Sequence, residues 1–160
     1  MRRLRNTLML WAFGFWKVPM ILWTRPVVEE LTDERCIVRI ALRRRTRNHV
    51  HSMYLAAFAV GADAAAALLV FHATRAAPAA VVPLFKDFHA DFLRRAEGDV
   101  LFCCEDGAAI RDAVARAAAT GERVNLPVQV VATVTPTQGR GPAARMSLTL
   151  SVKLRSAKRQ

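Results

Sequence analysis

Residues 48–75 read NHVHSMYLAAFAVGADAAAALLVFHATR, and this stretch decides the fold. Between Met53 and Phe71 it is rich in alanine and apolar nearly all round, with Gly61 as its one helix breaker and Asp63 as its one charge. Such a segment predicts a long helix that is either buried or in lipid. A carboxylate inside it costs free energy unless it is paired, hydrated or used in chemistry.

The segments on either side of this helix predict five antiparallel strands. Residues 36–45, 123–137 and 144–156 alternate apolar and polar side chains with a period of two, and a turn at 138–142 joins the last two. A turn at 97–99 is expected to form a hairpin between strands at 82–92 and 100–104. A short helix is expected over 107–120, with Asp106 as its N-cap and Gly121 at its end.

One-sided strands need a cover for their apolar face, and only the helix at 53–71 is apolar enough to supply it. As a membrane span, the same helix would carry Asp63 near its midpoint at a cost of about 2.5–3.5 kcal/mol. We therefore predict an α+β fold, a curved antiparallel sheet wrapped around a long central helix. An N-terminal helix and an extra helix between strands complete it. The predicted organisation is a helical segment at 1–25, one domain at 26–156 and a basic tail at 157–160.

The N-terminal stretch MRRLRNTLMLWAFGFWKVPMILWT imitates a signal peptide, but Lys17 and Pro19 interrupt it and no small-residue cleavage site follows. Its apolar run is too short to cross a bilayer. We expect a helix packed on the domain. The alternative is an interfacial helix that uses Trp11, Phe15 and Trp16 beside three arginines for peripheral membrane contact.

The 160 residues fit one domain, and the formal net charge is +11. That charge indicates an anionic partner or an arginine-rich solvated surface. Specific nucleic-acid binding is disfavoured, because the basic residues are scattered and no aromatic platform interleaves with them. Cys36, Cys103 and Cys104 show no metal-ligand spacing, so reduced thiols in a cytoplasmic protein are expected.

The segments NHVHSMYLAAFAVGAD and FKDFHADFLRRAEGDV resemble the hotdog-fold thioesterase superfamily. PaaI-like members carry an Asn before the helix and an acidic residue within it, as Asn48 and Asp63 stand here. A related hotdog family of unknown function, described only as thioesterase-like, is still more similar. The resemblance spans roughly residues 26–155. It implies Asp63 as general base or nucleophile, Asn48 as the residue that orients water or the carbonyl, and a cleft at a homodimer interface.

The helix N-terminus is the expected oxyanion site, because its backbone N–H groups are unpaired and its potential is positive. The candidate amides are those of Ser52, Met53, Tyr54 and Leu55. PaaI-like enzymes usually have a His-Gly-Gly stretch here, whereas this chain reads HSMYLAA, where side chains hinder the approach of a carbonyl. The structural alternative for Asp63 is a buried ion pair with an arginine, Lys86 or His72.

Two further residues are secondary candidates for substrate binding. His49 flanks the helix start, and with His51 it lacks a third metal ligand, so no metal is expected. Lys86 shares the predicted inward parity of its strand, where it would bind a carboxylate or phosphate of the substrate, unless it lies at a bulge or extends into water.

Two functions from different classes follow. The first is hydrolysis of an acyl-CoA or acyl-carrier thioester, with coenzyme A present only as part of the substrate and no other cofactor. The second is non-catalytic binding of an acyl chain or an acyl carrier in the same tunnel. Both imply a homodimer or a dimer of dimers, because the open edges of a five-stranded sheet must be paired or covered.

Overall fold

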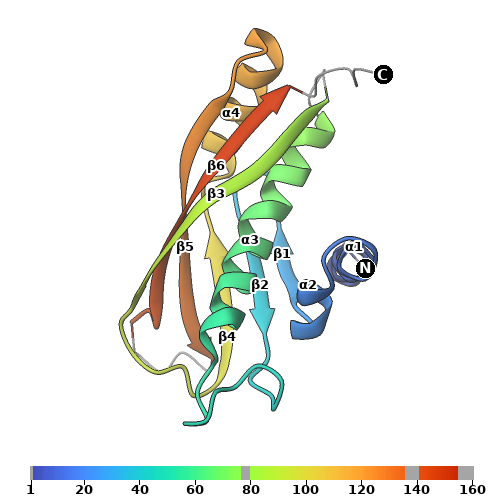
Figure 1. Ribbon diagram of the computed structural model, residues 1–160. Helices are drawn as coiled ribbons and strands as arrows, with labels where there is room; N and C mark the ends of the chain where they lie inside the picture. The colour runs from blue at the N-terminus through green and yellow to red at the C-terminus, as the bar shows by residue number, and fades with distance from the viewer. Residues whose placement is uncertain (1, 77–79, 136–140, 155–160) are drawn as a thin grey trace.

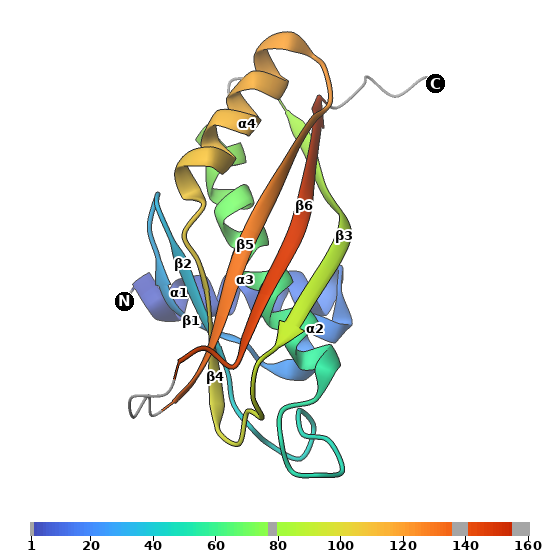
Figure 2. The ribbon, with the colours of Figure 1, turned by 90° about the vertical axis from the view of Figure 1, so that its left-hand side faces the viewer.

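The computed structural model describes residues 2–76, 80–135 and 141–154 (Figure 1). The predicted basic tail at 157–160 and most of the predicted turn at 138–142 lie outside these residues. Within them, a curved antiparallel sheet wraps around one long helix, as Figures 1 and 2 show from two directions. The predicted α+β architecture is confirmed.

The sheet has six strands in the order β1-β2-β4-β5-β6-β3, and every neighbouring pair is antiparallel. The strands are β1 (Val27–Leu31), β2 (Cys36–Ile40), β3 (Val81–Phe92), β4 (Asp99–Cys104), β5 (Val124–Thr135) and β6 (Ala144–Leu154). The expected number of five strands is wrong, because β1 was missed. Its sequence, VVEEL, is short and lacks a clear alternation, so it is recognised only by its pairing with β2.

The predicted hairpin around residues 97–99 is also wrong. β3 pairs with β6 at one edge of the sheet, whereas β4 lies between β2 and β5. The segment between β3 and β4 forms backbone hydrogen bonds with other parts of the chain. The N–H groups of Leu93 and Arg94 donate to the carbonyl of Ala143, and the carbonyl of Ala96 accepts from the N–H of Met53. These bonds carry the chain away from β3 before β4 begins.

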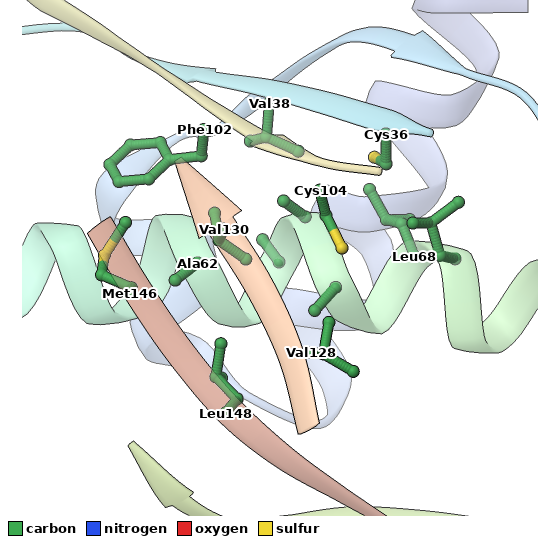
Figure 3. Packing of buried hydrophobic residues seen from close by; sticks show 14 of the residues in the cluster. Cys36, Val38, Ala62, Leu68, Phe102, Cys104, Val128, Val130, Met146 and Leu148 are labelled. Atoms are coloured by element: carbon green, nitrogen blue, oxygen red, sulfur yellow. The ribbon is translucent and has the colours of Figure 1, made fainter. Parts of the chain in front are cut away.

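The long helix α3 (Leu55–Ala76) has the length and hydropathy of a membrane span. Here it is the core helix of the domain, because Ala62, Ala65 and Leu69 are buried in its packing with the sheet. Figure 3 shows Ala62 and Leu68 of α3 beneath strand residues that include Phe102, Val130 and Met146. The predicted cover of the sheet is thus confirmed.

Helices α1 (Arg2–Trp16) and α2 (Pro19–Thr24) lie beside β1 (Figure 1). The Oγ1 atom of Thr7 accepts a 3.0 Å hydrogen bond from the N–H of Val28, and the Trp11 indole donates to the carbonyl of Pro26 at 2.7 Å. Residues 2–24 are therefore packed on the domain, and α1 covers the outer edge of the sheet at β1.

The short helix α4 (Gly107–Thr120) agrees with its prediction and ends at Gly121, whose φ of 71° is the left-handed conformation that favours glycine. Asp106 occupies the N-cap position, but its side chain does not cap the helix. Its Oδ2 instead accepts a 2.6 Å hydrogen bond from the N–H of Gln129 on β5. This carboxylate therefore ties α4 to the sheet.

Candidate active site

Asp63 lies near the middle of α3, on the side that the sheet leaves uncovered. Its neighbours one turn away, Ala59, Val60 and Ala67, are half-buried, whereas Ala62 and Ala64 beside it are buried. The same side of α3 lines a groove of about 1430 Å³, enclosed by α1, α2, α3 and the first half of β3. The groove is mostly apolar, with Leu10, Phe13, Ile21, Leu68, Leu84 and Phe85 among its walls.

The carboxyl of Asp63 has no hydrogen bond or ion pair with any residue that the structure describes. Burial raises its pKa above the ordinary value of 3.8. Two residues considered as its partners are placed elsewhere: His72 bonds Asp33 with 2.7 Å between Nε2 and Oδ1, and Lys86 is exposed. The ion-pair alternative therefore finds no support among the described residues.

Asn48 holds the loop that precedes α3. Its Oδ1 accepts hydrogen bonds from the N–H groups of Val50 and Ser52 at 3.1 and 3.0 Å, and its Nδ2 donates to the Ser52 hydroxyl at 3.0 Å. Because an amide nitrogen carries two protons, one N–H remains for a ligand. The Ser52 hydroxyl is buried in this loop and bonded to Asn48.

The four backbone amides predicted to bind an oxyanion are not equally available. The N–H of Ser52 donates to Asn48, that of Met53 to the carbonyl of Ala96, and that of Tyr54 to the carbonyl of Thr46. Leu55 begins α3, and within the described chain its N–H donates to no acceptor outside the helix. Of the amides in the first turn of α3, that of Ala57 donates to the carbonyl of Tyr54, so the candidate oxyanion site narrows to the amides of Leu55 and Ala56.

The two halves of the predicted site lie apart along α3. Leu55 and Asp63 are eight residues apart, which is about 12 Å of helix at 1.5 Å per residue. A thioester carbonyl held at the first turn is therefore out of hydrogen-bond reach of Asp63 in the same chain. The Asn48 loop belongs to the Leu55 end.

His49 and Lys86 do not line the groove. His49 is exposed in the loop before α3. Lys86 is exposed where the register between β3 and β6 shifts, so the inward parity drawn for it is wrong and the bulge alternative is confirmed. At this bulge, Oδ1 of Asp87 accepts a 2.8 Å hydrogen bond from the N–H of Thr149.

Sequence reasoning missed three arginines that line the groove: Arg2 and Arg5 from α1, and Arg75 from the last turn of α3. No local pattern could have found them, because α1 and the end of α3 meet only in the folded chain. There the guanidinium of Arg75 contacts the sulfur of Met9, with 3.8 Å from Nη1 to Sδ. Among the described residues, no cluster of three His, Cys, Asp or Glu is placed to hold a metal ion.

Solved structures with the same fold cover nearly the whole chain. A protein of unknown function from Chlorobaculum tepidum superposes with a TM-score of 0.80 at 11% identity, covering 96% of this chain and 97% of its own. A Pseudomonas aeruginosa protein described as "Probable Thioesterase" gives 0.74 at 19% identity, with 93% and 96% covered. A thioesterase from Haemophilus influenzae gives 0.59 at 10% identity, with 88% and 86% covered.

These likenesses establish the fold: the chain has the hotdog fold. No curated protein matches the sequence significantly. The chain belongs to the family described as "Domain of unknown function (DUF4442)", whose model matches residues 5–152. The predicted relationship to an uncharacterised, thioesterase-like hotdog family is thereby confirmed.

Proposed function

We propose that this protein hydrolyses acyl thioesters and that Asp63 is the general base or nucleophile. The observation that carries the proposal is a half-buried carboxyl without a described partner on the wall of a large apolar groove. A raised pKa brings a carboxylate closer to the pH at which a general base works best. As base, Asp63 would take a proton from water while the water oxygen bonds the thioester carbon. The carbon–sulfur bond then breaks, and the sulfur takes the proton back from Asp63 and leaves as the free thiol.

The groove suits the acyl part of such a substrate. Its walls are mainly aliphatic and aromatic, and its 1430 Å³ exceeds what a small polar acyl group would fill. We therefore expect longer acyl chains to be favoured, since burial of apolar surface stabilises binding by about 25 cal/mol per Å².

The anionic part of the substrate has a candidate site at the other end of α3. Four exposed arginines, at 43, 44, 45 and 47, lie in the loop before the helix. The hydrogen bond from Met53 to Ala96 brings the loop that carries Arg95 beside them. Arginine is well suited to phosphate, so coenzyme A or the phosphopantetheine of a carrier protein would be held here. Binding should then weaken as salt rises.

The site needs a second copy of the chain. The 12 Å between the first turn of α3 and Asp63 prevents one protomer from holding the carbonyl and attacking it. In an antiparallel pair of α3 helices, Asp63 of one protomer would lie opposite the helix N-terminus and the Asn48 loop of its partner. We therefore propose a homodimer with the cleft at its interface.

The edge of the sheet at β3 is the proposed interface. α1 covers the opposite edge, at β1. β3 pairs with β6 on one side only, and its exposed apolar residues include Val82, Leu84 and Phe88. An uncovered apolar edge strand invites pairing with another chain.

The test is hydrolysis of acyl-CoA thioesters of increasing chain length, followed by release of the free thiol. Asp63→Asn should lower turnover by about 10²–10⁴-fold if Asp63 is the base. Asp112→Asn, an exposed carboxylate on α4, is the matched control and should leave the rate unchanged. Hydrolysis that survives Asp63→Asn would place the catalytic group elsewhere.

Non-catalytic binding of an acyl chain or acyl carrier is the second candidate. The observation in its favour is that the amides of Ser52, Met53 and Tyr54 are occupied and that no glycine opens the helix start. Acyl-CoA that binds stoichiometrically without release of thiol at any chain length would establish this function over hydrolysis.

For either function, we expect a cytoplasmic protein with its free cysteines reduced.

A further inference from the structure

The N-terminal helices expose an apolar surface that the domain does not use. Six large side chains of α1 and α2 are 52–77% exposed: Leu4, Leu8, Phe15, Trp16, Met20 and Trp23. We call this set the α1–α2 surface. Soluble domains rarely expose so many large apolar side chains together unless the surface binds something.

This exposure is not a consequence of poor docking. Thr7, Leu10 and Gly14 on the other side of α1 are buried, and Thr7 is bonded to β1. Leu4, Leu8 and Phe15 recur at spacings of four and seven residues, which places them on one side of the helix. α1 therefore has two apolar sides, of which one binds the domain and the other faces outward.

The charges carried by the segment that forms the α1–α2 surface have one sign. Residues 2–25 contain Arg2, Arg3, Arg5, Lys17 and Arg25 and no acidic residue. Of these five cations, only Arg3 forms an ion pair with a residue that the structure describes, and its partner is Glu29. The other four cations are free to meet an anionic partner.

We infer that the α1–α2 surface binds the surface of an anionic phospholipid bilayer. Tryptophan and phenylalanine on an amphipathic element insert at the boundary between headgroups and acyl chains, while arginine and lysine bind the phosphates. A second copy of the chain is the less suitable occupant, because it would bring its own basic residues against these. This inference goes beyond the proposed hydrolysis and does not depend on it.

The same surface adjoins the groove. Arg2 and Arg5 of α1 line the groove that contains Asp63, so its wall and the proposed membrane contact share one helix. An acyl chain could then pass between the bilayer and the groove with little exposure to water. Only this last step rests on the proposed function.

Intrinsic fluorescence gives a direct test, because all three tryptophans lie at positions 11, 16 and 23. The full-length protein is titrated with vesicles of phosphatidylcholine mixed with phosphatidylglycerol, and with vesicles of phosphatidylcholine alone. We expect a blue shift and co-sedimentation with the mixed vesicles, both weakened by salt. Emission that stays unchanged with mixed vesicles would overturn the inference.

Two variants locate the contact. Leu8→Ser with Trp16→Ser should abolish co-sedimentation while the melting temperature is kept, because both side chains are exposed. Val50→Ser with Leu93→Ser removes two exposed apolar side chains outside this surface and should bind like the wild type. Equal binding by all three proteins would place the contact elsewhere and contradict the inference.

Charge and self-association are tested separately. Arg5→Ser with Lys17→Ser should weaken binding about 25-fold, at about 5-fold for each cation near an anionic surface. Arg116→Ser with Arg145→Ser removes the same charge from other exposed sites and should have a much smaller effect. A blue shift that grows with protein concentration without lipid would show that a second copy covers the surface instead. A failed vesicle test leaves acyl-CoA hydrolysis measurable in solution, so the two proposals can fail independently.

Discussion

Gly61 of α3 lies directly against the ring of Phe102 on β4. A methyl group at Gly61 would sit 2.5 Å from Cδ2 of that ring, closer than real side-chain atoms approach. The Phe102 side chain is fully buried, and its ring also packs edge-on against Phe58 with 5.7 Å between the ring centroids. The helix breaker in the middle of α3 is therefore a packing requirement of the core.

Gly61→Ala should lower the free energy of unfolding by about 2 kcal/mol, because overpacking costs about 1–3 kcal/mol and exceeds the gain of about 1 kcal/mol in helix propensity. Denaturant unfolding measures this. Gly141→Ala is the matched control, since nothing lies within 4 Å of its added methyl, and it should change stability by less than about 0.5 kcal/mol. A Gly61→Ala protein as stable as the wild type would mean that the Phe102 ring can move aside without loss of folding free energy, which would contradict the packing requirement.

Asp63→Asn should make the protein less sensitive to pH. Burial raises the pKa of Asp63 in the folded state, so the folded state binds more protons than the unfolded state above pH 3.8. The wild type therefore loses stability as pH rises from 3.8 through the raised pKa, and the variant avoids this loss. Above that pKa, the variant should be at least as stable as the wild type.

Urea unfolding of both proteins over a pH series measures the difference. A buried ion pair would give the opposite sign, since removal of one partner costs about 3–5 kcal/mol. An Asp63→Asn protein that is less stable than the wild type by about 3–5 kcal/mol at neutral pH would therefore indicate that Asp63 forms a buried ion pair.

Val82→Lys with Leu84→Lys should separate the proposed dimer into monomers, because lysine on an edge strand opposes pairing with another strand. Both side chains are exposed in the protomer, so the two substitutions should not destabilise the fold of the protomer itself. Light scattering gives the mass of the wild type and of the variant, and the mass should fall from that of a dimer to that of a monomer. Ala115→Lys with Ala119→Lys places the same charge on the exposed side of α4 and should leave the dimer intact. A wild-type monomer at micromolar concentration would contradict the interface.

Cys103 should be the first thiol to react with a disulfide reagent. It is half-exposed, whereas Cys36 and Cys104 face each other in register between β2 and β4 and are fully buried. Burial raises the pKa of all three thiols, that of Cys104 to about 12, and only the thiolate reacts. Thiol counting should give one slow reaction in the native protein and three after unfolding. Cys103→Ser should remove the native reaction, and a native count of two or more would contradict the burial.

The elements with strong local periodicity could be predicted from the sequence. α3 follows from its apolar, alanine-rich composition, and β5 and β6 from alternation that continues over ten or more residues. Such patterns show which sides of a helix or strand are buried. Because the strands are apolar on one side and α3 is apolar nearly all round, they also predict that α3 covers the sheet. The two-residue period of a strand also puts adjacent Cys103 and Cys104 on opposite sides of β4, where one is half-exposed and the other is buried.

Pairing between distant segments could not be predicted in this way. β3 and β4 are neighbours in the sequence, yet the hydrogen bonds of Leu93 and Arg94 to Ala143 separate them. The bulge in β3 reverses the parity of its side chains after Phe85, and that reversal put Lys86 on the wrong face. Both features depend on β6, which is more than fifty residues further along the chain.

The sequence alone determined that Asp63 is the exceptional residue of the core helix, because a lone carboxylate in an apolar segment is visible without a structure. Only the tertiary structure decided that it has no described partner and that it faces a groove shared with Arg2, Arg5 and Arg75. The reason is physical: composition sets what burial of a residue costs, whereas packing between distant segments decides which groups surround it.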